Sequence, residues 1–223
     1  MPDSVAGVLL AAGEGSRFGQ PKALVELAGQ TLAERGVQLL RAGGADPIIV
    51  VTGAAPVHLT GIHPVQNDQW RTGMGSSLRA ALSALAGAGH QPAPGRAAHE
   101  QDSWPAEVGA VVVALADQPL VGAAAVARLI AAYRAGATVA VAAYDGKPRN
   151  PVLLARIHWP EVAAAAAGDQ GARAFLRAHP ELVTLVECGD TGSPADIDTP
   201  EDLARLRAAA AGGQAASPGP EGS

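Results

Sequence analysis

The stretch Val5–Lys22, VAGVLLAAGEGSRFGQPK, joins an apolar run of strand length directly to a glycine-rich loop. The apolar part, Val5–Ala11, carries no polar side chain, which is typical of a strand buried on both faces of a sheet. Glycines let backbone amides approach an anion closely, and successive amides can form an anion-binding concavity. Arg17 and Lys22 add cations that suit phosphate oxygens. The stretch therefore predicts a phosphate-binding loop at the end of a buried strand.

Two familiar phosphate loops do not fit this stretch. The Walker pattern needs Gly-Lys-Ser or Gly-Lys-Thr at the end of the loop, and Gly19–Lys22, GQPK, does not supply it. The dinucleotide-binding pattern needs a third glycine where Phe18 stands. The plain alternative is a tight turn between a strand and a helix in which the basic residues are incidental.

Strand-like and helix-like segments alternate along the rest of the chain. Thr31 and Glu34 have the spacing of a capping box at a helix start, and Asp145–Gly146 is typical of a hairpin turn. The alternation predicts an α/β fold of three layers, in which a mostly parallel, twisted, Rossmann-like sheet has helices on both faces. Strands are expected at 5–11, 48–52, around 65, at 111–115, 138–143, 151–154 and 182–187, and helices at 31–42, 76–86, 121–135, 160–167, 171–178 and 200–210.

The length of 223 residues suits one domain with a single core, and we assign that domain to residues 1–210. Residues 87–107 are rich in glycine, proline and polar residues and are expected to form a long mobile loop. Residues 211–223 have the composition of a disordered tail.

Composition excludes several classes of protein. The net charge of -5 argues against a general nucleic-acid binder, which would show a basic excess. The single cysteine, Cys188, excludes a disulfide framework within the chain. The N-terminus lacks the basic start of a signal peptide, and the apolar run at 5–12 is too short to span a bilayer. We therefore expect a cytoplasmic protein with neither a membrane nor a nucleic acid as partner.

Two acidic motifs flank predicted elements: one follows a strand and the other precedes a helix. Asp117 directly follows the most apolar strand, and a carboxylate there suits Mg²⁺, although it could instead cap the next helix. Later in the chain, Thr199, Pro200 and Asp202 have the pattern of a helix start. That pattern explains residues 199–202 but leaves the preceding acids at 196 and 198 unexplained.

A third motif, Asn67–Leu78, NDQWRTGMGSSL, follows the weakest strand. Gly73 and Gly75 leave room for a ring to lie against the backbone, and the helix start offers amides and hydroxyls to a base or a phosphate. A capped helix after a loop is the plainer interpretation. The tryptophan within the motif, Trp70, is equally well explained as a partly buried anchor of the loop.

With these motifs in place, the chain resembles the nucleotidyltransferase superfamily that includes sugar-phosphate and molybdenum cofactor transferases, and within it the molybdenum cofactor cytidylyltransferase branch. The resemblance runs from about Val5 to Leu203 and leaves the 87–107 segment over. It implies that an acid near the C-terminus joins Asp117 on Mg²⁺, and the register favours Asp198, with Asp196 as the fallback. It assigns catalysis to Arg17, Lys22 and Asp117, and nucleotide binding to Leu10, Ala11, Ala12, Gly13, Gly15, Arg17, Lys22, Asn67, Gly73, Ser77 and Asp117.

The acceptor is expected at two further segments that resemble this branch, GKPRNP at 146–151 and GDQGAR at 168–173. The resemblance assigns Arg149, Asn150, Asp169 and Arg173 to the acceptor. The branch usually carries histidine where Asn150 stands, which puts the role of that position in doubt. The basic residues of both segments are equally well explained as solvated charges on a turn and a helix.

The resemblance implies transfer of CMP from CTP to the phosphorylated pterin of the molybdenum cofactor, with release of pyrophosphate and with a molybdoenzyme as a client. Guanylyl-transferring relatives tend to have two glycines where Ala12 and Gly13 stand, and the extra methyl favours CTP over GTP. The alternatives are a guanylyltransferase for the same cofactor, a cytidylyltransferase for a sugar or polyol phosphate, and a non-catalytic protein that binds nucleotide and delivers the cofactor.

Overall fold

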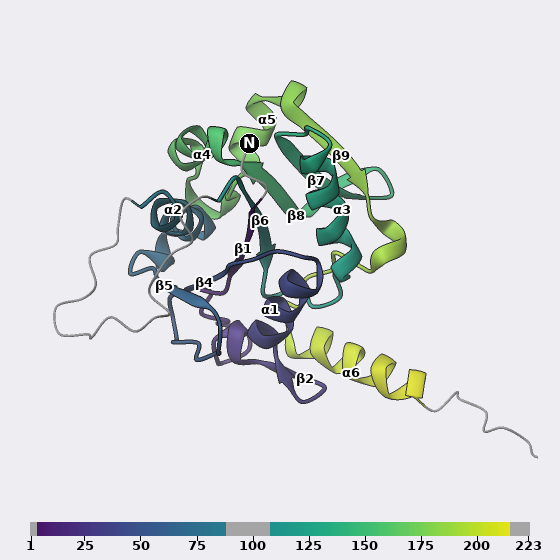
Figure 1. Ribbon diagram of the computed structural model, residues 1–223. Coiled ribbons are helices and arrows are strands. Elements are labelled where there is room, and N and C mark those ends of the chain that lie inside the picture. The colour runs from purple at the N-terminus through teal and green to yellow at the C-terminus, as the bar shows by residue number, and fades with distance from the viewer. Residues whose placement is uncertain (1–3, 88–107, 215–223) are drawn as a thin grey trace, which may run out of the picture.

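A mixed sheet of seven strands forms the centre of the computed structural model, which describes residues 4–87 and 108–214 (Figure 1). The strand order is β5-β4-β1-β6-β8-β7-β9, and β8 runs antiparallel to both of its neighbours while the other pairs are parallel. The predicted mostly parallel sheet is therefore confirmed. The strands are β1 (Val5–Leu10), β4 (Ile48–Thr52), β5 (His63–Gln66), β6 (Ala110–Leu115), β7 (Val139–Tyr144), β8 (Lys147–Ala155) and β9 (Val183–Glu187).

Helices cover both faces of this sheet, which confirms the three layers. One apolar cluster joins α1 and α3 to one face, and a second joins α2, α4 and α5 to the other (Figure 1). Each fully buried leucine, isoleucine or phenylalanine in these clusters stabilises the fold by about 1.5–3 kcal/mol relative to exposure. The helices are α1 (Leu32–Ala42), α2 (Met74–Leu85), α3 (Ala123–Arg134), α4 (Trp159–Ala165), α5 (Arg173–Ala178) and α6 (Pro200–Gln214).

The two central strands end together. In the parallel pair of β1 and β6, Val5 lies opposite Ala110 and Leu10 lies opposite Leu115, and every residue of both strands is buried. Strand β4 pairs with the other side of β1 in parallel. The loops that leave β1, β4 and β6 therefore gather at one edge of the sheet, where α/β proteins bind ligands.

Local signals placed several elements correctly. The Thr31 hydroxyl accepts a hydrogen bond from the Glu34 amide (3.1 Å), and the Glu34 carboxylate accepts one from the Thr31 amide (2.6 Å), so the predicted capping box is present. Asp145 and Gly146 both have positive φ (52° and 71°) and connect β7 to β8 as the predicted hairpin. An aspartate tolerates this conformation better than most residues, and glycine adopts it without strain.

Several boundaries differ from the prediction, among them those of α2, β8 and α6. Helix α2 begins at Met74, before Ser76, because the Ser76 hydroxyl donates to the carbonyl oxygen of Gly73 (2.8 Å) inside the first turn. Strand β8 begins at Lys147, not at residue 151, because pairing with β7 resumes beyond a register shift after Val141. Helix α6 continues to Gln214, four residues beyond the predicted end at 210.

The predicted loop at 87–107 lies, apart from Gly87, outside the described residues, as do residues 215–223 of the predicted tail. A short antiparallel pair, β2 (Glu26–Leu27) with β3 (Gln30–Thr31), was not predicted. Across residues 4–87 and 108–214, the structure contains no helix of the length and apolar character that crossing a membrane requires.

Helix α6 returns the end of the chain to the segment that follows the glycine loop. Ile197 is fully buried with Val25, Leu27, Leu32 and Leu203 in a small apolar cluster of its own. In Figure 1, α6 accordingly lies beside β2 and α1. This packing brings the acidic motif before α6 to the loop after β1, although nearly the whole chain separates them.

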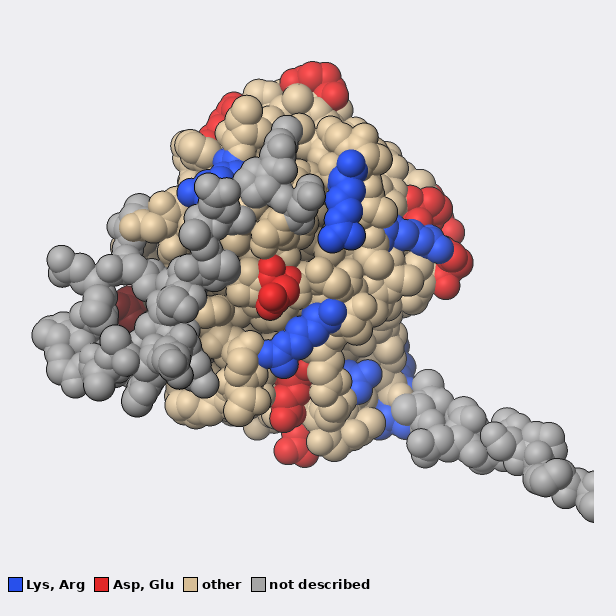
Figure 2. Space-filling model, in the orientation of Figure 1, with Lys and Arg blue, Asp and Glu red and all other residues tan. Residues whose placement is uncertain are grey.

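Charged side chains are interspersed over the described part of the face shown in Figure 2, where basic and acidic groups alternate. A protein that binds the phosphate backbone of a nucleic acid typically presents one continuous basic surface. The described residues on this face form no continuous basic area (Figure 2).

Candidate functional site

The loop after β1 is folded tightly back on itself. Gly15 and Gly19 have positive φ (63° and 67°), which glycine adopts readily. A Cβ placed on Gly15 would collide with the carbonyl oxygen of Gln20 and would lie 2.9 Å from the amide nitrogen of Lys22. The loop can therefore take this shape only with glycine at position 15, and the shape fixes where Lys22 begins the short helix Lys22–Leu24.

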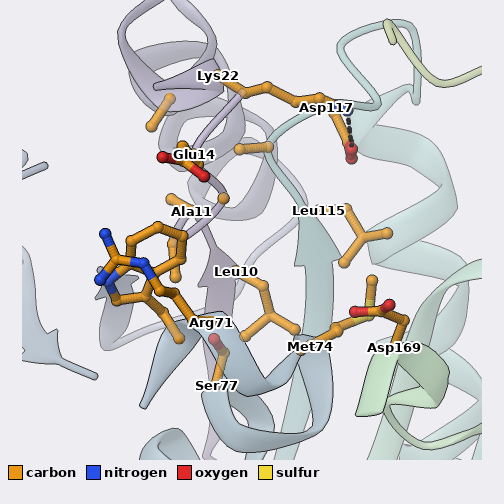
Figure 3. A pocket seen from close by; sticks show the side chains of 16 residues that line it. Leu10, Ala11, Glu14, Lys22, Arg71, Met74, Ser77, Leu115, Asp117 and Asp169 are labelled. Carbon is orange, nitrogen blue, oxygen red and sulfur yellow. Dashed lines mark hydrogen bonds and ion pairs between the residues drawn. The ribbon is translucent and has the colours of Figure 1, made fainter. Parts of the chain in front are cut away.

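Lys22 lies between two carboxylates from distant parts of the chain. Its Nζ is 3.0 Å from Oδ2 of Asp117 and 2.6 Å from Oδ1 of Asp198. Figure 3 shows the Lys22 side chain reaching across the mouth of the cavity to Asp117. One ammonium group thus links the loop after β1, the end of β6 and the segment before α6.

The backbone places each acid. Asp117 directly follows β6, and its carbonyl oxygen accepts a hydrogen bond from the Ile197 amide (2.8 Å). The Asp202 carboxylate accepts hydrogen bonds from the Asp198 amide (3.1 Å) and the Thr199 amide (2.9 Å), as part of the cap of α6. The predicted helix start thereby also fixes the position of Asp198.

Asp198 and Asp196, which the sequence left as rivals, face different partners. Asp198 contacts Lys22, whereas the Asp196 carboxylate accepts a hydrogen bond from Nε2 of Gln118 (2.8 Å). Burial raises the pKa of Asp196 above its ordinary value, against the hydrogen bond from Gln118, and the nearby charges of Asp117 and Asp198 raise it further.

The carboxylates around Lys22 favour the protonated, positively charged form of its side chain. Partial burial alone would lower the pKa of Lys22, but the charge of Asp117 and the hydrogen bonds and charge of the two acids outweigh it and raise the pKa above 10.5. Among the described residues, no three His, Cys, Asp or Glu side chains are grouped to hold a metal ion. The pair Asp117 and Asp198 therefore suits a cation that takes its remaining ligands from elsewhere, as Mg²⁺ does from substrate phosphates.

A cavity of about 490 Å³, the glycine-loop cavity, opens beside these charges. Leu10 and Leu115 of the paired strands lie on its wall together with the start of α2 (Figure 3). Most of the residues that the sequence assigned to the nucleotide line it: Leu10, Ala11, Ala12, Gly13, Lys22, Gly73, Ser77 and Asp117.

Gly15, Arg17 and Asn67 do not line this cavity. Gly15 acts through the shape of the loop, and Arg17 is exposed on it. Asn67 is only 5% exposed, and its Nδ2 donates to the hydroxyls of Ser76 (2.8 Å) and Ser77 (3.0 Å). Its amide group therefore holds the start of α2, a structural task that the helix-start motif did not reveal.

Other wall residues were missed or were assigned to the acceptor. Trp70 stacks with Arg71, whose guanidinium carbon lies 4.2 Å from the ring centroid, and both line the cavity. Asp169, predicted for the acceptor, lines the same cavity, because a Cβ on Gly73 would lie 2.7 Å from its Oδ1. Asp169 lies there because its segment approaches Gly73 closely, and no local sequence pattern predicts that approach. The wall also includes Glu14, Ala23, Met74, Leu115 and Ala116.

A second cavity of about 680 Å³, the arginine cavity, lies against β7, β8, β9 and α5. Its wall contains three of the four residues predicted for the acceptor, Arg149, Asn150 and Arg173, and omits Asp169. Gln118 also lines it, although its neighbour Asp117 lines the glycine-loop cavity, so the two cavities flank the end of β6. The remaining wall residues are Val141, Pro148, Val152, Leu176, Arg177, Pro180, Val183, Leu185, Pro194 and Asp196.

Comparison with known proteins places this geometry in a family. A model of the MobA-like NTP transferase domain matches residues 7–183. The chain is 37% identical over 216 residues to nicotine blue oxidoreductase from Paenarthrobacter nicotinovorans, a match that covers 91% of this chain and 96% of that protein. It is 38% identical over 87 residues to a probable molybdenum cofactor guanylyltransferase from Opitutus terrae, which covers 39% of this chain and 43% of the relative.

The fold agrees with that match. A crystal structure of Rv0371C from Mycobacterium tuberculosis in complex with manganese superposes with a TM-score of 0.67 at 26% identity, over 92% of this chain and 98% of the other. The glycine loop, strand β1 from Gly7 onward, strand β6 and most of the sheet lie within the matched residues 7–183. The chain belongs to the family of MobA-like NTP transferases.

Proposed function

We propose that this chain transfers CMP from CTP to a phosphorylated pterin, the organic part of the molybdenum cofactor, and releases pyrophosphate. The observation that carries the proposal is the position of Lys22 between Asp117 and Asp198 at the glycine-loop cavity. A triphosphate needs cations for its phosphates and acids for its metal ion, and this arrangement offers both at the end of a glycine-rich loop.

The donor set fits Mg²⁺. Asp117 and Asp198 are two hard oxygen donors that already share one cation, the Lys22 ammonium. A bound Mg²⁺ would supply neutralisation of phosphate charge and alignment of donor and acceptor. The manganese complex of the mycobacterial relative supports a divalent ion in this family.

The chain's own residues then position the reactants and stabilise charge. An oxygen of the acceptor's terminal phosphate attacks the α-phosphorus of CTP and forms a new P–O–P linkage. The bond from the α-phosphorus to the bridging oxygen breaks, and its electron pair leaves with pyrophosphate. The attacking phosphate is already anionic, so catalysis is mostly positioning and electrostatic stabilisation. Lys22 and the loop amides would hold the departing pyrophosphate, and Arg17, exposed on the same loop, would add a second cation.

The shape around Ala12 supports a pyrimidine. Ala12 is 7% exposed, and its Cβ would lie 2.9 Å from a Cβ placed on Gly53, beside Trp70. The Ala12 methyl group and the Trp70 side chain therefore both lie close to Gly53, and both residues line the cavity, where this one methyl group takes up space. A difference of this size changes the preference between bases by about 1–3 kcal/mol.

The arginine cavity supports an acceptor with a flat ring and an acidic group. Val141, Val152 and Leu185 give it an apolar wall, and Arg149 and Arg173 give it cations. An apolar wall suits the face of a ring, while guanidinium groups suit phosphate. A molybdoenzyme client would follow from this choice of acceptor.

An acceptor-by-nucleotide screen tests the proposal. Pyrophosphate release is measured with CTP and GTP, each with molybdopterin, the molybdenum cofactor and sugar or polyol phosphates, and products are identified by mass. We expect a cytosine dinucleotide of the pterin. GTP turnover would select the guanylyltransferase, turnover with a sugar phosphate would select the other cytidylyltransferase, and nucleotide binding without release would select the delivery protein.

Variants connect that activity to the site. Lys22→Ala and Asp117→Ala should each lose most of the transfer while retaining the native circular dichroism spectrum. Arg134→Ala removes an exposed cation from the last turn of α3 and serves as the matched control. Near-normal turnover of either site variant would remove that residue from the mechanism.

One observation favours a second candidate. The relative from Paenarthrobacter nicotinovorans matches nearly the full length of both chains and is named an oxidoreductase. The same screen therefore includes NADH and NADPH with nicotine blue, followed by the absorbance of the nicotinamide. Oxidation of the nicotinamide without any pyrophosphate release would favour that activity over nucleotidyl transfer.

A further inference from the structure

Gln118, the residue after Asp117, is a buried side chain that joins two segments far apart in the sequence. It is 6% exposed, and its Nε2 donates to the carbonyl oxygen of Pro194 (3.1 Å) and to Oδ1 of Asp196 (2.8 Å). Both partners are acceptors, which assigns the nitrogen of the amide to that side. The segment 191–197, here called the acidic loop, is thus tied to the end of β6.

The backbone reinforces this tie. The Ser193 amide donates to the carbonyl oxygen of Leu120 (2.9 Å), and the Ile197 amide donates to that of Asp117 (2.8 Å). A Cβ on Gly192 would collide with the carbonyl oxygen of Leu120, so the acidic loop lies directly against the turn after β6. Gln118 supplies the side-chain bond in the middle of this contact.

Asp198 follows the acidic loop and is fixed from two directions. On one side, the loop is tied by Gln118; on the other, the Asp202 carboxylate accepts the Asp198 amide (3.1 Å). Oδ1 of Asp198 accepts a hydrogen bond from Nζ of Lys22 (2.6 Å). Loss of the Gln118 bonds would remove the side-chain tie and leave the backbone bonds of Ser193 and Ile197, which would widen the range of positions open to Asp198.

The same bond borders the arginine cavity. Gln118, Pro194 and Asp196 all line that cavity, while Asp117 faces the glycine-loop cavity. A molecule in the arginine cavity would therefore lie beside the groups that tie the acidic loop to the end of β6. Partners of this kind typically change metal affinity by about 10–100-fold when they are removed.

We propose that Gln118 is a positioning residue: its bonds to Pro194 and Asp196 help to hold Asp198 beside Lys22, and they connect the arginine cavity to the metal-binding acids. The inference rests on the proposed function for the role of the two acids. It assigns Asp196 to hydrogen bonding with Gln118 and not to the metal ion.

Mn²⁺ binding to the purified protein, followed by the electron paramagnetic resonance signal of free Mn²⁺, tests the inference without acceptor or turnover. Gln118→Met keeps the size of the side chain and removes its donor. We expect about tenfold weaker Mn²⁺ binding than in the natural protein. Gln38→Met, at an exposed glutamine on α1, is the matched control and should bind Mn²⁺ as the natural protein does.

Two substitutions of Asp196 separate a hydrogen-bond role from a metal-ligand role. Asp196→Asn keeps an oxygen that accepts from Gln118 and removes the charge, so it should retain Mn²⁺ affinity. Asp196→Leu removes the acceptor and should weaken binding as Gln118→Met does. Equal losses in Asp196→Asn and Asp196→Leu would make Asp196 a metal ligand and would overturn the inference.

Kinetics give a second readout. The acceptor in the arginine cavity would lie against Gln118 and Asp196. Gln118→Met should therefore raise KM for the acceptor and lower kcat, and KM for CTP should change least. Unchanged Mn²⁺ affinity in Gln118→Met would sink the inference and leave the proposed function standing. Absence of Mn²⁺ binding by the natural protein would overturn the metal site and the inference with it.

Discussion

Lys22 is the side chain on which the account of the site depends most. It is the counter-ion of two carboxylates, and its side chain and that of Asp117 are 20% and 26% exposed. Asp198 is half-exposed at 49%, so solvent screens that part of the interaction. The same two acids are the proposed metal ligands. Either the Lys22 ammonium or a metal ion can therefore balance their negative charge.

Lys22→Met should destabilise the metal-free protein, because two neighbouring carboxylates lose their shared cation. We expect a loss of about 1–2 kcal/mol in EDTA, which lowers Tm by about 2–8 °C in a domain of this size. Saturating Mg²⁺ should restore most of the loss. Thermal unfolding with EDTA and with Mg²⁺ measures both effects, and Lys147→Met, at an exposed lysine of the hairpin, is the control. A loss that persists unchanged in Mg²⁺ would argue against a shared cation site.

Local chemistry could be predicted for individual residues where a pattern carries it. Lys22 and Asp117 were found from a glycine loop and from the end of an apolar strand. For Asn67 the sequence did not reveal the bonds to Ser76 and Ser77 that hold a helix start, and its role in nucleotide binding stays a prediction. The hydrogen bond between Gln118 and Asp196, on which the proposed choice of Asp198 over Asp196 rests, follows from no spacing rule.

Among the elements, the glycine loop makes the most specific demand on its residues. Gly15 and Gly19 both have positive φ, but only a Cβ on Gly15 would meet neighbouring atoms within 4 Å. Substitution at Gly19 therefore costs mainly backbone strain, whereas substitution at Gly15 also pushes against the segment that carries Lys22.

Gly19→Ala should lower the free energy of unfolding by about 1–2 kcal/mol and leave CTP binding nearly intact. Gly15→Ala should cost more and should weaken CTP binding by at least about tenfold, because Lys22 must shift. Urea unfolding and calorimetric CTP titration of the two variants provide the comparison. Equal CTP affinities would show that the shape of the loop does not set the position of Lys22.

A separate electrostatic contact lies at the end of α5, beside α4. Both nitrogens of His179 face carboxylates, Nε2 that of Glu161 (2.7 Å) and Nδ1 that of Glu181 (3.3 Å), and its ring lies 4.8 Å from that of Phe175. Burial would lower the pKa of His179, but the hydrogen bonds and charges of the two glutamates outweigh it and raise the pKa above 6.5.

A histidine with a raised pKa stabilises the fold fully below its ordinary pKa and loses that contribution as pH rises through the raised value. The natural protein should therefore exceed His179→Gln in Tm by more at about pH 5.5 than at about pH 8.5. Thermal unfolding of both proteins at the two pH values measures the difference. A gap that is constant with pH would mean that His179 remains neutral in the folded protein.

Elements were predictable to the extent that local periodicity determines them. The buried strands β1, β4 and β6 and the capped helix α1 stand where their patterns placed them. The early start of β8 depends on pairing with β7, and the position of Asp169 depends on a close approach at Gly73. Both are contacts between segments, which a pattern within one segment does not contain.

At the scale of the whole chain, the proposed site depends on the packing of the C-terminal part of the chain against the segment that follows the loop after β1. Ile197 is fully buried in a small cluster with Val25, Leu27 and Leu32 from the N-terminal part and Leu203 from α6. This cluster closes the distance between the two halves of the proposed site. The sequence suggested the partners of the site but not the apolar contacts that unite them.

Ile197→Ala should cost about 2–5 kcal/mol of stability, and Ile197→Val about 0.5–1.5 kcal/mol. Because Ile197 directly precedes Asp198, the alanine variant should also weaken Mn²⁺ binding more than its loss of stability explains. Urea unfolding and Mn²⁺ titration below the unfolding transition separate the two effects. Full Mn²⁺ affinity in the folded alanine variant would show that this cluster is not needed to place Asp198.

The central claim is that Lys22, Asp117 and Asp198 surround one triphosphate and its metal ion. The most direct test is the affinity for CTP at saturating Mg²⁺, measured by calorimetry for the natural protein, Asp117→Asn and Asp198→Asn. The account predicts at least about tenfold weaker CTP binding in each variant, since each removes one of the two carboxylates that hold the ion. Natural affinity for CTP in both variants would contradict it.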